Sequence, residues 1–141
     1  MTEVRFNAVL FCDDVRRETT GKDILIGVYG GDILVNSFPQ WLPLAIWAEI
    51  EAEKPGHHTL LFRLTYADNP PLNMKAEMNV SGEGPSGVSL PRLEVLVESE
   101  GVLALEVRRN NEEPWRELKR KQVRKRTSPV LPMGGHRPGE Q

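Results

Sequence analysis

The sequence predicts an all-β protein, a single antiparallel β-sandwich of immunoglobulin-like architecture with about seven or eight strands. In its clearest segment, Leu72 to Val80, every second residue is apolar, which places these side chains on one face of a strand. Similar segments recur about every ten residues, with turn signals between them, as is typical of sandwiches and barrels. No helical stripe or long crossover for a parallel sheet is present. The Cys…Trp…Cys pattern of true immunoglobulin domains is also absent.

Length and composition fit one compact domain, residues 1–123, followed by a tail, residues 124–141. The chain has 141 residues, of which 39% are hydrophobic and 27% charged, enough for one core but not for two. The tail is first basic and then rich in proline and glycine, so we expect it to be flexible. No apolar run could span a bilayer or act as a secretory signal, and the single Cys12 cannot form an internal disulfide. These features predict a cytoplasmic protein.

The first strands are expected at residues 5–12 and 23–29. Residues 5–12 carry apolar side chains on both faces, which suits a central strand. The polar segment 13–22 ends in a turn glycine and predicts a loop or a short helical turn. Gly30 and Gly31 allow a bulge or a chain crossing before the strand resumes at residues 33–35.

The middle of the chain predicts a hairpin and a further strand. Pro39 and Pro43 interrupt regular structure around Trp41, which we expect to be a loop residue that covers the core. Residues 44–53 and 58–67 both alternate and are joined by Pro55-Gly56, so they predict a hairpin. In the next strand, 72–80, one face should be buried and the other exposed. The buried residues are Met74, Ala76 and Met78, and the exposed ones are Lys75, Glu77 and Asn79.

The remaining strands lie after a loop. Residues 81–89 are rich in glycine, serine and proline and predict that loop. Residues 93–99 and 102–109 alternate on either side of Glu100-Gly101 and predict a second hairpin. A last strand is expected at residues 115–123.

Charge is unevenly distributed along the chain. Residues 1–118 hold 11 Lys and Arg against 19 Asp and Glu, a net charge of −8, whereas residues 119–141 hold 7 against 1, a net charge of +6. A basic tail on an acidic body indicates either an anionic partner or contact between the tail and the body itself. We favour the second interpretation, or simple solvation of the tail.

Several segments of the N-terminal half resemble a family of small bacterial and phage proteins, a domain of unknown function. The resemblance rests on a Cys-Asp-Asp-Val-Arg segment, residues 12–16, that precedes a Gly-Val-Tyr strand, residues 27–29. Phe11, Gly21-Lys22, Ile26, Phe38-Pro39 and Leu42-Pro43 extend it. It implies a sandwich-like domain and no particular activity.

The residues that could carry chemistry do not form a complete set. Asp13 and Asp14 could bind a hard cation, but no calcium-loop motif surrounds them, so a capped turn paired with Arg16, Arg17 or Lys22 is the preferred interpretation. Cys12 could act as a nucleophile with His57 or His58; free cysteines are more often buried and structural. Two histidines alone do not make a zinc site. Gly27, Gly30 and Gly31 lack the helix and the lysine of a phosphate loop. We therefore predict no cofactor, no metal and no enzymatic activity.

Two surfaces are candidates for binding. Trp47 shares a face with glutamates and could anchor a partner, although burial between the sheets is an equal alternative; Asp13, Asp14, Arg16 and Arg17 complete this candidate partner site. The second surface is a basic run that could contact nucleic acid phosphates, and the aromatic residues that stack on bases are missing from it. Its residues are Lys119, Arg120, Lys121, Arg124, Lys125 and Arg126.

The preferred hypothesis is a non-enzymatic protein-interaction or structural module that self-associates or binds a protein, and that is a phage-associated accessory or structural component. It would then be cytoplasmic, or virion-associated if a phage encodes it. The alternative is a nucleic-acid-associated protein that binds through residues 119–126. No membrane partner is expected.

Overall fold

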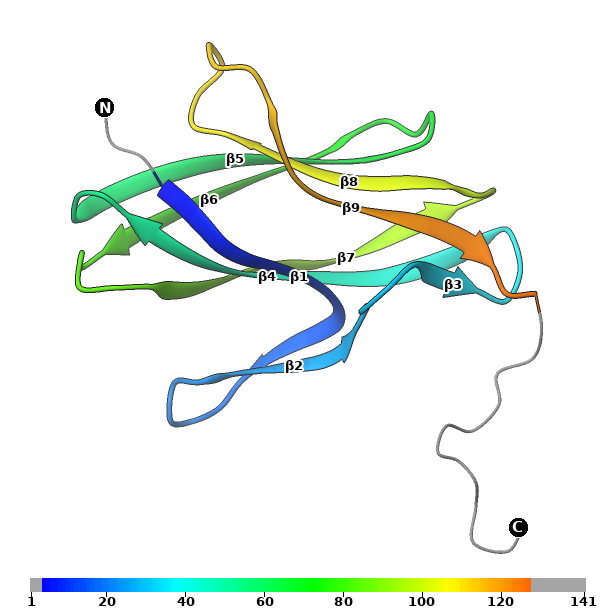
Figure 1. Cartoon of the computed structure of the whole chain (residues 1–141), viewed down its shortest axis with the longest axis horizontal. Helices are drawn as coiled ribbons and strands as arrows, with labels where there is room; N and C mark the ends of the chain where they lie inside the picture. The colour runs from blue at the N-terminus through cyan, green and yellow to red at the C-terminus, as the bar shows by residue number, and fades with distance from the viewer. Residues whose placement is uncertain (1–3, 128–141) are drawn as a thin grey trace, which may run out of the picture.

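The computed structural model describes residues 4–127, which form two curled β-sheets packed face to face (Figure 1). No helix occurs among these residues, so this part of the chain has none that could cross a membrane. The strands are β1 Val4–Arg17, β2 Asp23–Val28, β3 Ile33–Val35, β4 Gln40–Ala52, β5 Gly56–Tyr66, β6 Leu72–Val80, β7 Ser86–Val97, β8 Gly101–Arg108 and β9 Arg116–Lys125.

The strands divide into a four-stranded sheet of order β2-β1-β4-β7 and a five-stranded sheet of order β3-β9-β8-β5-β6. Neighbouring strands are antiparallel, except that β3 runs parallel to β9. The all-β class and the two-sheet arrangement are therefore confirmed. The described residues contain nine strands rather than seven or eight, because the short β3 is a separate element from β2.

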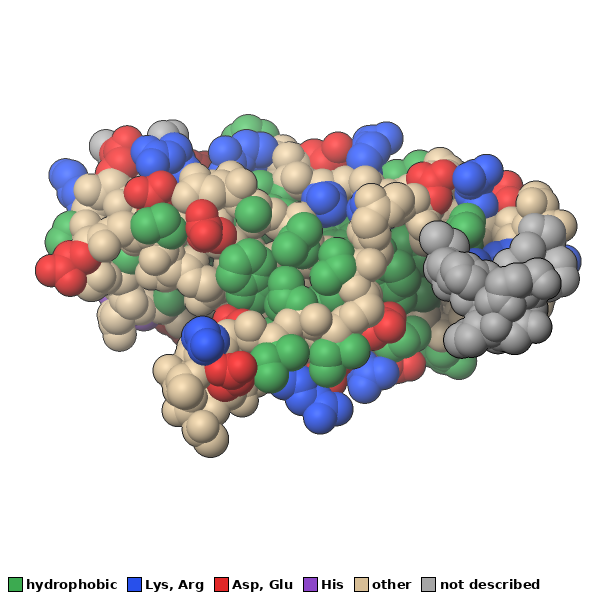
Figure 2. All heavy atoms as spheres, turned by 60° about the horizontal axis from the view of Figure 1, so that its bottom comes forward, with side chains coloured by type: hydrophobic (Ala, Val, Ile, Leu, Met, Phe, Trp, Pro, Cys, Tyr) green, Lys and Arg blue, Asp and Glu red, His purple; other side chains and the backbone are tan. Residues whose placement is uncertain are grey.

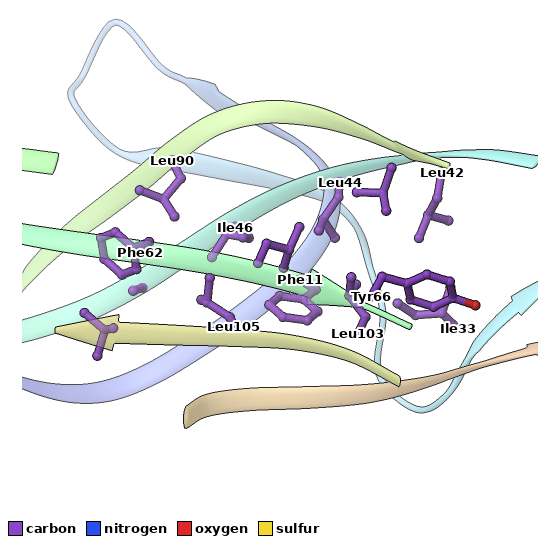
Figure 3. Close-up of a cluster of buried hydrophobic side chains, with 14 of the residues drawn as sticks. Phe11, Ile33, Leu42, Leu44, Ile46, Phe62, Tyr66, Leu90, Leu103 and Leu105 are labelled. Atoms are coloured by element: carbon purple, nitrogen blue, oxygen red, sulfur yellow. The ribbon is translucent and has the colours of Figure 1, made fainter. Parts of the chain in front are cut away.

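One hydrophobic cluster fills the space between the sheets (Figure 3). Phe11 and Ile46 from the four-stranded sheet and Leu64 and Leu105 from the five-stranded sheet are at most 2% exposed. Burial of each such side chain contributes about 1.5–3 kcal/mol. Phe6 adds an edge-to-face contact with a ring on β5, with centroids 6.2 Å apart. The sheets are held together mainly by these apolar contacts.

Strand β6 has the expected alternation. Its inward side chains are half-buried and its outward side chains are exposed, because β6 lies at the edge of the five-stranded sheet. The half-buried residues are Met74, Ala76 and Met78, and the exposed ones are Lys75, Glu77 and Asn79.

Both expected hairpins are wrong in their pairing. The segments 93–99 and 102–109 fall in β7 and β8, which belong to different sheets: β7 pairs with β4, and β8 pairs with β5 and β9. The segments 44–53 and 58–67 fall in β4 and β5, which are likewise in different sheets. A turn signal shows where the chain reverses. It does not show whether the next strand stays in the same sheet or crosses to the facing one.

Three expected irregular segments are strands. Residues 13–17 continue β1, and residues 86–89 belong to β7, where their backbone pairs with β4 despite their small and polar side chains. Trp41 lies in β4 and is 59% exposed, so it is not a lid on the core. Pro43 is tolerated in the same strand because pairing of β4 with β1 ends at Ala45, which leaves that side of Pro43 without a ladder partner.

Strand β9 extends beyond the expected domain boundary at residue 123. Arg124 pairs with Leu34, Lys125 pairs with Val35, and the Arg126 amide donates to the Val35 carbonyl at 2.8 Å. The first residues of the expected tail thus complete the five-stranded sheet. Residues 128–141, on which the rest of that expectation falls, lie outside the described residues.

Candidate functional site: the β1–β2 arm

The end of β1 and all of β2 form a two-stranded extension of the four-stranded sheet, which we call the β1–β2 arm (residues 13–29). Cys12 is the last residue of β1 paired with β4, through Ala45, and it also pairs with Val28 of β2. Beyond Cys12, β1 pairs with β2 only. The arm therefore projects from the two packed sheets (Figure 1).

The inner side of the arm is fixed to the four-stranded sheet by Asp23. One carboxylate oxygen of Asp23 accepts the indole N–H of Trp47 at 3.0 Å, and the other lies 3.3 Å from the Arg17 guanidinium. Gly87 of β7 leaves space for the indole, since a Cβ there would lie 3.2 Å from the ring. The predicted residues Trp47 and Arg17 thus meet at one carboxylate. Trp47 is half-buried, and its polar group already has an intramolecular partner.

The base of the arm is fixed by Tyr29. Its hydroxyl lies 2.8 Å from Asp13 Oδ1, to which it donates, and 3.3 Å from the Pro43 carbonyl oxygen. Burial raises the pKa of Tyr29, and the hydrogen bond to Asp13 raises it further. Gly27 has a φ of +67°, and a Cβ there would lie 2.2 Å from Asp13 Oδ2. A residue without a side chain is therefore required beside this carboxylate.

Asp13 and Asp14 are engaged separately and do not share a ligand site. Asp14 accepts hydrogen bonds from the Arg16 Nε at 3.0 Å and from the Val15 amide at 2.9 Å. The hydrogen bond from Arg16 is the main reason that the pKa of Asp14 is lowered. No cluster of three potential metal ligands occurs in the described part of the chain. Asp14 thus pairs with Arg16, as the sequence suggested, but it does so within strand β1 and not in a turn.

Cys12 is fully buried at the base of the arm. Its thiol donates weakly to the Asp14 and Ala45 carbonyls, at 3.4 and 3.6 Å, and burial raises its pKa. A bulge after Phe6 changes which face the later residues occupy, so Phe6 and Phe11 both face the core and Cys12 does not share their face.

The two histidines lie far from this thiol. His57 and His58 border Val4, at the opposite end of β1. Cys12 lies eight residues after Val4 in the strand, which corresponds to about 26 Å. Among the described residues, Cys12 is therefore not brought together with His57 or His58.

The outer side of the arm presents an apolar row. Ile24, Ile26 and Val28 are 43%, 42% and 46% exposed, and they lie on the edge strand of the four-stranded sheet. Figure 2 shows hydrophobic side chains gathered on the face from which the arm projects. The sequence predicted this strand, at residues 23–29, but its exposed apolar face was not predicted. The sequence does contain a signal for this exposed face. Residues 24, 25, 26 and 28 are all apolar, so both faces of the strand are apolar, whereas the facing sheet can cover only one of them.

The basic residues of β9 do not form one cationic surface. Arg120 pairs with Glu117 at 2.8 Å, and Arg124 pairs with Asp32 at 3.0 Å. Lys119 is half-buried, and burial lowers its pKa, with a smaller contribution from the charge of Lys121. The other two basic residues are placed differently: Lys125 is exposed, and Arg126 is half-buried.

Trp115, the aromatic residue nearest the basic run, is also occupied. The Arg63 and Arg108 guanidiniums lie 4.5 and 4.1 Å from the centroid of its ring. Cations on an aromatic face take the place that a nucleobase would need for stacking. The nucleic-acid candidate residues therefore lack the stacking partner that a single-strand site uses.

A comparison with protein-family models finds one that matches residues 7–117, described as a family of unknown function (DUF6941). The match includes most of β1, the whole of the arm and strands β2 to β8. Most of β9 and the tail lie outside it. No curated protein matches the chain.

The environment of Cys12 predicts slow reaction with a thiol reagent in the native protein. Burial excludes the reagent and disfavours the thiolate, which is the reactive form. Labelling with a chromogenic disulfide should be slow at pH 7 and complete rapidly in denaturant. Fast labelling without unfolding would show an accessible thiolate and reopen a catalytic role for Cys12.

Replacement of Gly27 by alanine should loosen the arm. The new methyl group would displace Asp13 from Tyr29, and the positive φ adds strain, so we expect a loss of about 2–4 kcal/mol in urea unfolding. Gly21→Ala is the matched control, because Gly21 also has a positive φ, of +93°, but open space around it. It should cost only about 1 kcal/mol. Equal losses in the two variants would show that the Asp13 contact contributes nothing.

Proposed function

We propose that this chain, which belongs to the DUF6941 family, is a non-enzymatic structural module that binds a second copy of itself through strand β2. One observation carries the proposal: β2 is an edge strand with three exposed apolar side chains in a row. Edge strands of monomeric proteins usually carry charges, prolines or a covering segment, which prevent pairing with other chains. The interior of β2, residues 24–28, has no charged residue and no proline.

The strand order supports an immunoglobulin-like architecture as part of this proposal. In that architecture one sheet has the order A-B-E and the other the order G-F-C-C′. The orders β1-β4-β7 and β9-β8-β5-β6 correspond to these if β1 is strand A and β9 is strand G. Strand β2 has no counterpart in that scheme. The arm is then an addition to a complete sandwich, which supports a role in binding rather than in folding.

The apolar row is self-complementary, which favours a second copy as the partner. Ile24, Ile26 and Val28 are spaced symmetrically about Ile26. If two β2 strands pair antiparallel about a twofold axis at Ile26, each Ile24 lies opposite the Val28 of the other chain. Each exposed apolar side chain then covers another. A closed dimer of this kind joins two four-stranded sheets edge to edge.

Charges beside the row would not oppose this contact. Arg16 and Asp14 pair with Ile24 and Ile26 in the register of the arm, and they form an ion pair with each other. Asp23, at the start of β2, is engaged by Arg17 and Trp47. The partner-site residues predicted from the sequence therefore serve here to shape and neutralise the arm, and Ile24, Ile26 and Val28 make the contact.

The proposal includes the biological setting suggested by the resemblance to bacterial and phage proteins. The segments that carry the resemblance, residues 12–16 and 27–29, form one strand of the arm and the base of the other. A module that repeats one symmetric contact suits a phage-associated accessory or structural component, located in the cytoplasm or in the virion. Nucleic-acid binding through residues 119–126 is the alternative function.

Substitution of Ile26 by lysine should prevent self-association. Two lysines would face each other at the twofold axis, which removes apolar contact and adds like-charge repulsion. We therefore expect the dissociation constant of the dimer to rise tenfold or more, a change of about 1.4 kcal/mol or more. The molar mass is measured by light scattering after size exclusion, with the protein concentration raised to about 500 µM. The unmodified chain should reach about twice 15.9 kDa, and Ile26→Lys should keep the mass of the monomer.

Leu34→Lys is the matched control. Leu34 is 40% exposed on β3, an edge strand of the five-stranded sheet, so this substitution should leave the dimer unchanged. Circular dichroism should show equal folding of all three proteins. A monomeric unmodified chain over the whole concentration range, or equal loss in both variants, would contradict the proposal.

The alternative function gives a separate prediction. We expect no submicromolar binding of single- or double-stranded nucleic acid near physiological salt, because the basic side chains are divided and partly neutralised. Fluorescence anisotropy with labelled oligonucleotides measures this directly. Submicromolar affinity that falls in the triple variant Arg124→Gln, Lys125→Gln, Arg126→Gln, with unchanged folding, would favour the alternative.

A further inference from the structure

A groove of about 380 Å³ lies where the edges of the two sheets come together, and we call it the Trp41 groove. Residues of the edge strands β6 and β7, one from each sheet, line it together with the loop between β5 and β6 and with part of β4. In the four-stranded sheet, β7 is the edge opposite to β2. The residues on which the argument rests are Trp41, Asn69, Leu72, Glu94, Leu96 and Glu98.

Hydrogen bonds fix the walls of the groove. Asn69 Nδ2 donates to the Leu96 carbonyl at 2.9 Å and so ties the β5–β6 loop to β7, and the Tyr66 hydroxyl donates to the Ser99 carbonyl. Ala67, in that loop, has a φ of +49° and is the one non-glycine residue with positive φ in the described part of the chain. Such a conformation costs energy and persists where the surrounding contacts enforce it. The groove is therefore formed before any ligand binds.

The side chain of Trp41 gives the groove an open aromatic face. It is 59% exposed, the highest value among the large hydrophobic residues described, and Leu72 on β6 is 39% exposed. The cation–π pairs among the described residues involve the rings of Trp115 and Phe6, so no cation from this part of the chain covers the Trp41 ring. The indole is therefore available to stack on a cation from another molecule.

The charge of the groove is negative. Among the residues that line it, the charged ones are Glu94 and Glu98, and both are exposed. Glu98 forms no ion pair within the described residues, and Glu94 pairs only with Arg92, at 3.5 Å. Because an exposed pair of this kind contributes little stability, Glu94 can exchange Arg92 for another cation. The groove therefore complements a basic ligand.

The backbone of β7 adds hydrogen-bonding groups at the same place. Strand β7 ends the four-stranded sheet, so β4 is its neighbour on one side and the other side is open. Glu94 pairs with Pro43 of β4, and the Pro43 carbonyl faces Tyr29, away from β7. Two residues directly opposite each other in an antiparallel pair point their backbone groups either both inward or both outward. The N–H and C=O of Glu94 therefore face the open side, where an extended segment can pair with them.

From these observations we propose that the Trp41 groove binds an extended, arginine-bearing segment of a partner protein. The segment pairs with the backbone of Glu94, and its arginine stacks on Trp41 and forms an ion pair with Glu98. Arginine suits both contacts better than lysine does, because its planar guanidinium stacks on rings and matches a carboxylate with two hydrogen bonds. The four-stranded sheet then joins a second copy of the chain at β2 and a different, basic protein at β7.

Nuclear magnetic resonance of the full chain tests the proposal through the indole N–H signal of Trp41. Trp41→Leu assigns this signal, and those of Trp47 and Trp115 report that the fold is intact. The probe is a peptide Thr-Val-Arg-Val-Thr with blocked ends, whose β-branched residues favour an extended chain. It should shift the Trp41 signal saturably, with a dissociation constant in the millimolar range or below, and leave the other two signals unchanged.

The matched peptide has glutamine in place of arginine. It should bind about three- to thirtyfold more weakly, as expected for the loss of one exposed cation–π contact and one exposed ion pair. Glu98→Gln in the protein should weaken binding of the arginine peptide by about two- to fivefold. The preference for arginine over glutamine should fall by the same factor, because both changes remove the same ion pair.

Glu83→Gln is the matched control variant of the protein. Glu83 is also exposed and forms no ion pair within the described residues, but it does not line the groove. This variant should bind both peptides as the unmodified chain does. Ile26→Lys should also bind them unchanged, since β2 lies at the other edge of the sheet. The dimer and the groove ligand are therefore tested independently, and either proposal can fail without the other.

A Trp41 signal that does not respond to the arginine peptide at about 10 mM, or that responds equally to the glutamine peptide, would overturn the proposal. Equal loss of binding in Glu98→Gln and Glu83→Gln would overturn it as well. A Trp41 signal that moves with protein concentration in the absence of peptide would place a second copy of the chain in the groove, which would contradict a basic partner protein as its ligand.

Discussion

The point at which β1 leaves β4 determines the rest of the arm. Cys12 is the last residue of β1 paired with β4, and Pro43 stands where the next pairs would form. The Pro43 carbonyl faces Tyr29, and in a strand the nitrogen of a residue faces the same side as its carbonyl. Pro43 therefore offers no N–H donor to β1. The ladder ends there, β1 bends away, and β2 becomes its only neighbour.

A two-stranded extension is only marginally stable unless something fixes it, and two contacts fix the arm to the rest of the four-stranded sheet. Asp23 accepts the Trp47 indole at one end, and Tyr29 bridges Asp13 and Pro43 at the other. Both contacts use the inner side of the arm. The outer row of Ile24, Ile26 and Val28 takes part in neither, so its apolar character has no explanation in the folding of the single chain.

Alternation of apolar residues predicted the strands and their buried faces well, as in β6, because a period of two is a local property. Sheet membership could not be predicted in this way. The turn at Glu100-Gly101 looks the same whether β8 stays beside β7 or crosses to the other sheet. The partner of Trp47 was equally hidden, since Asp23 lies 24 residues earlier and is brought near by the bend at Cys12. Glycine at position 87 is explained only by the indole that lies over it.

Part of the basic charge of β9 is neutralised by contacts within the described part of the chain. Basic residues of β9 pair with Glu117 and Asp32, and the Glu100 carboxylate accepts the Lys125 amide. Of these pairs, Arg120 with Glu117 lies within β9, and Arg124 with Asp32 joins β9 to an acidic residue elsewhere in the described part of the chain. Electrostatic attraction here helps β9 to complete the sheet between β3 and β8. Binding by this protein is then better sought where exposed apolar side chains lack partners, at β2 and at Trp41.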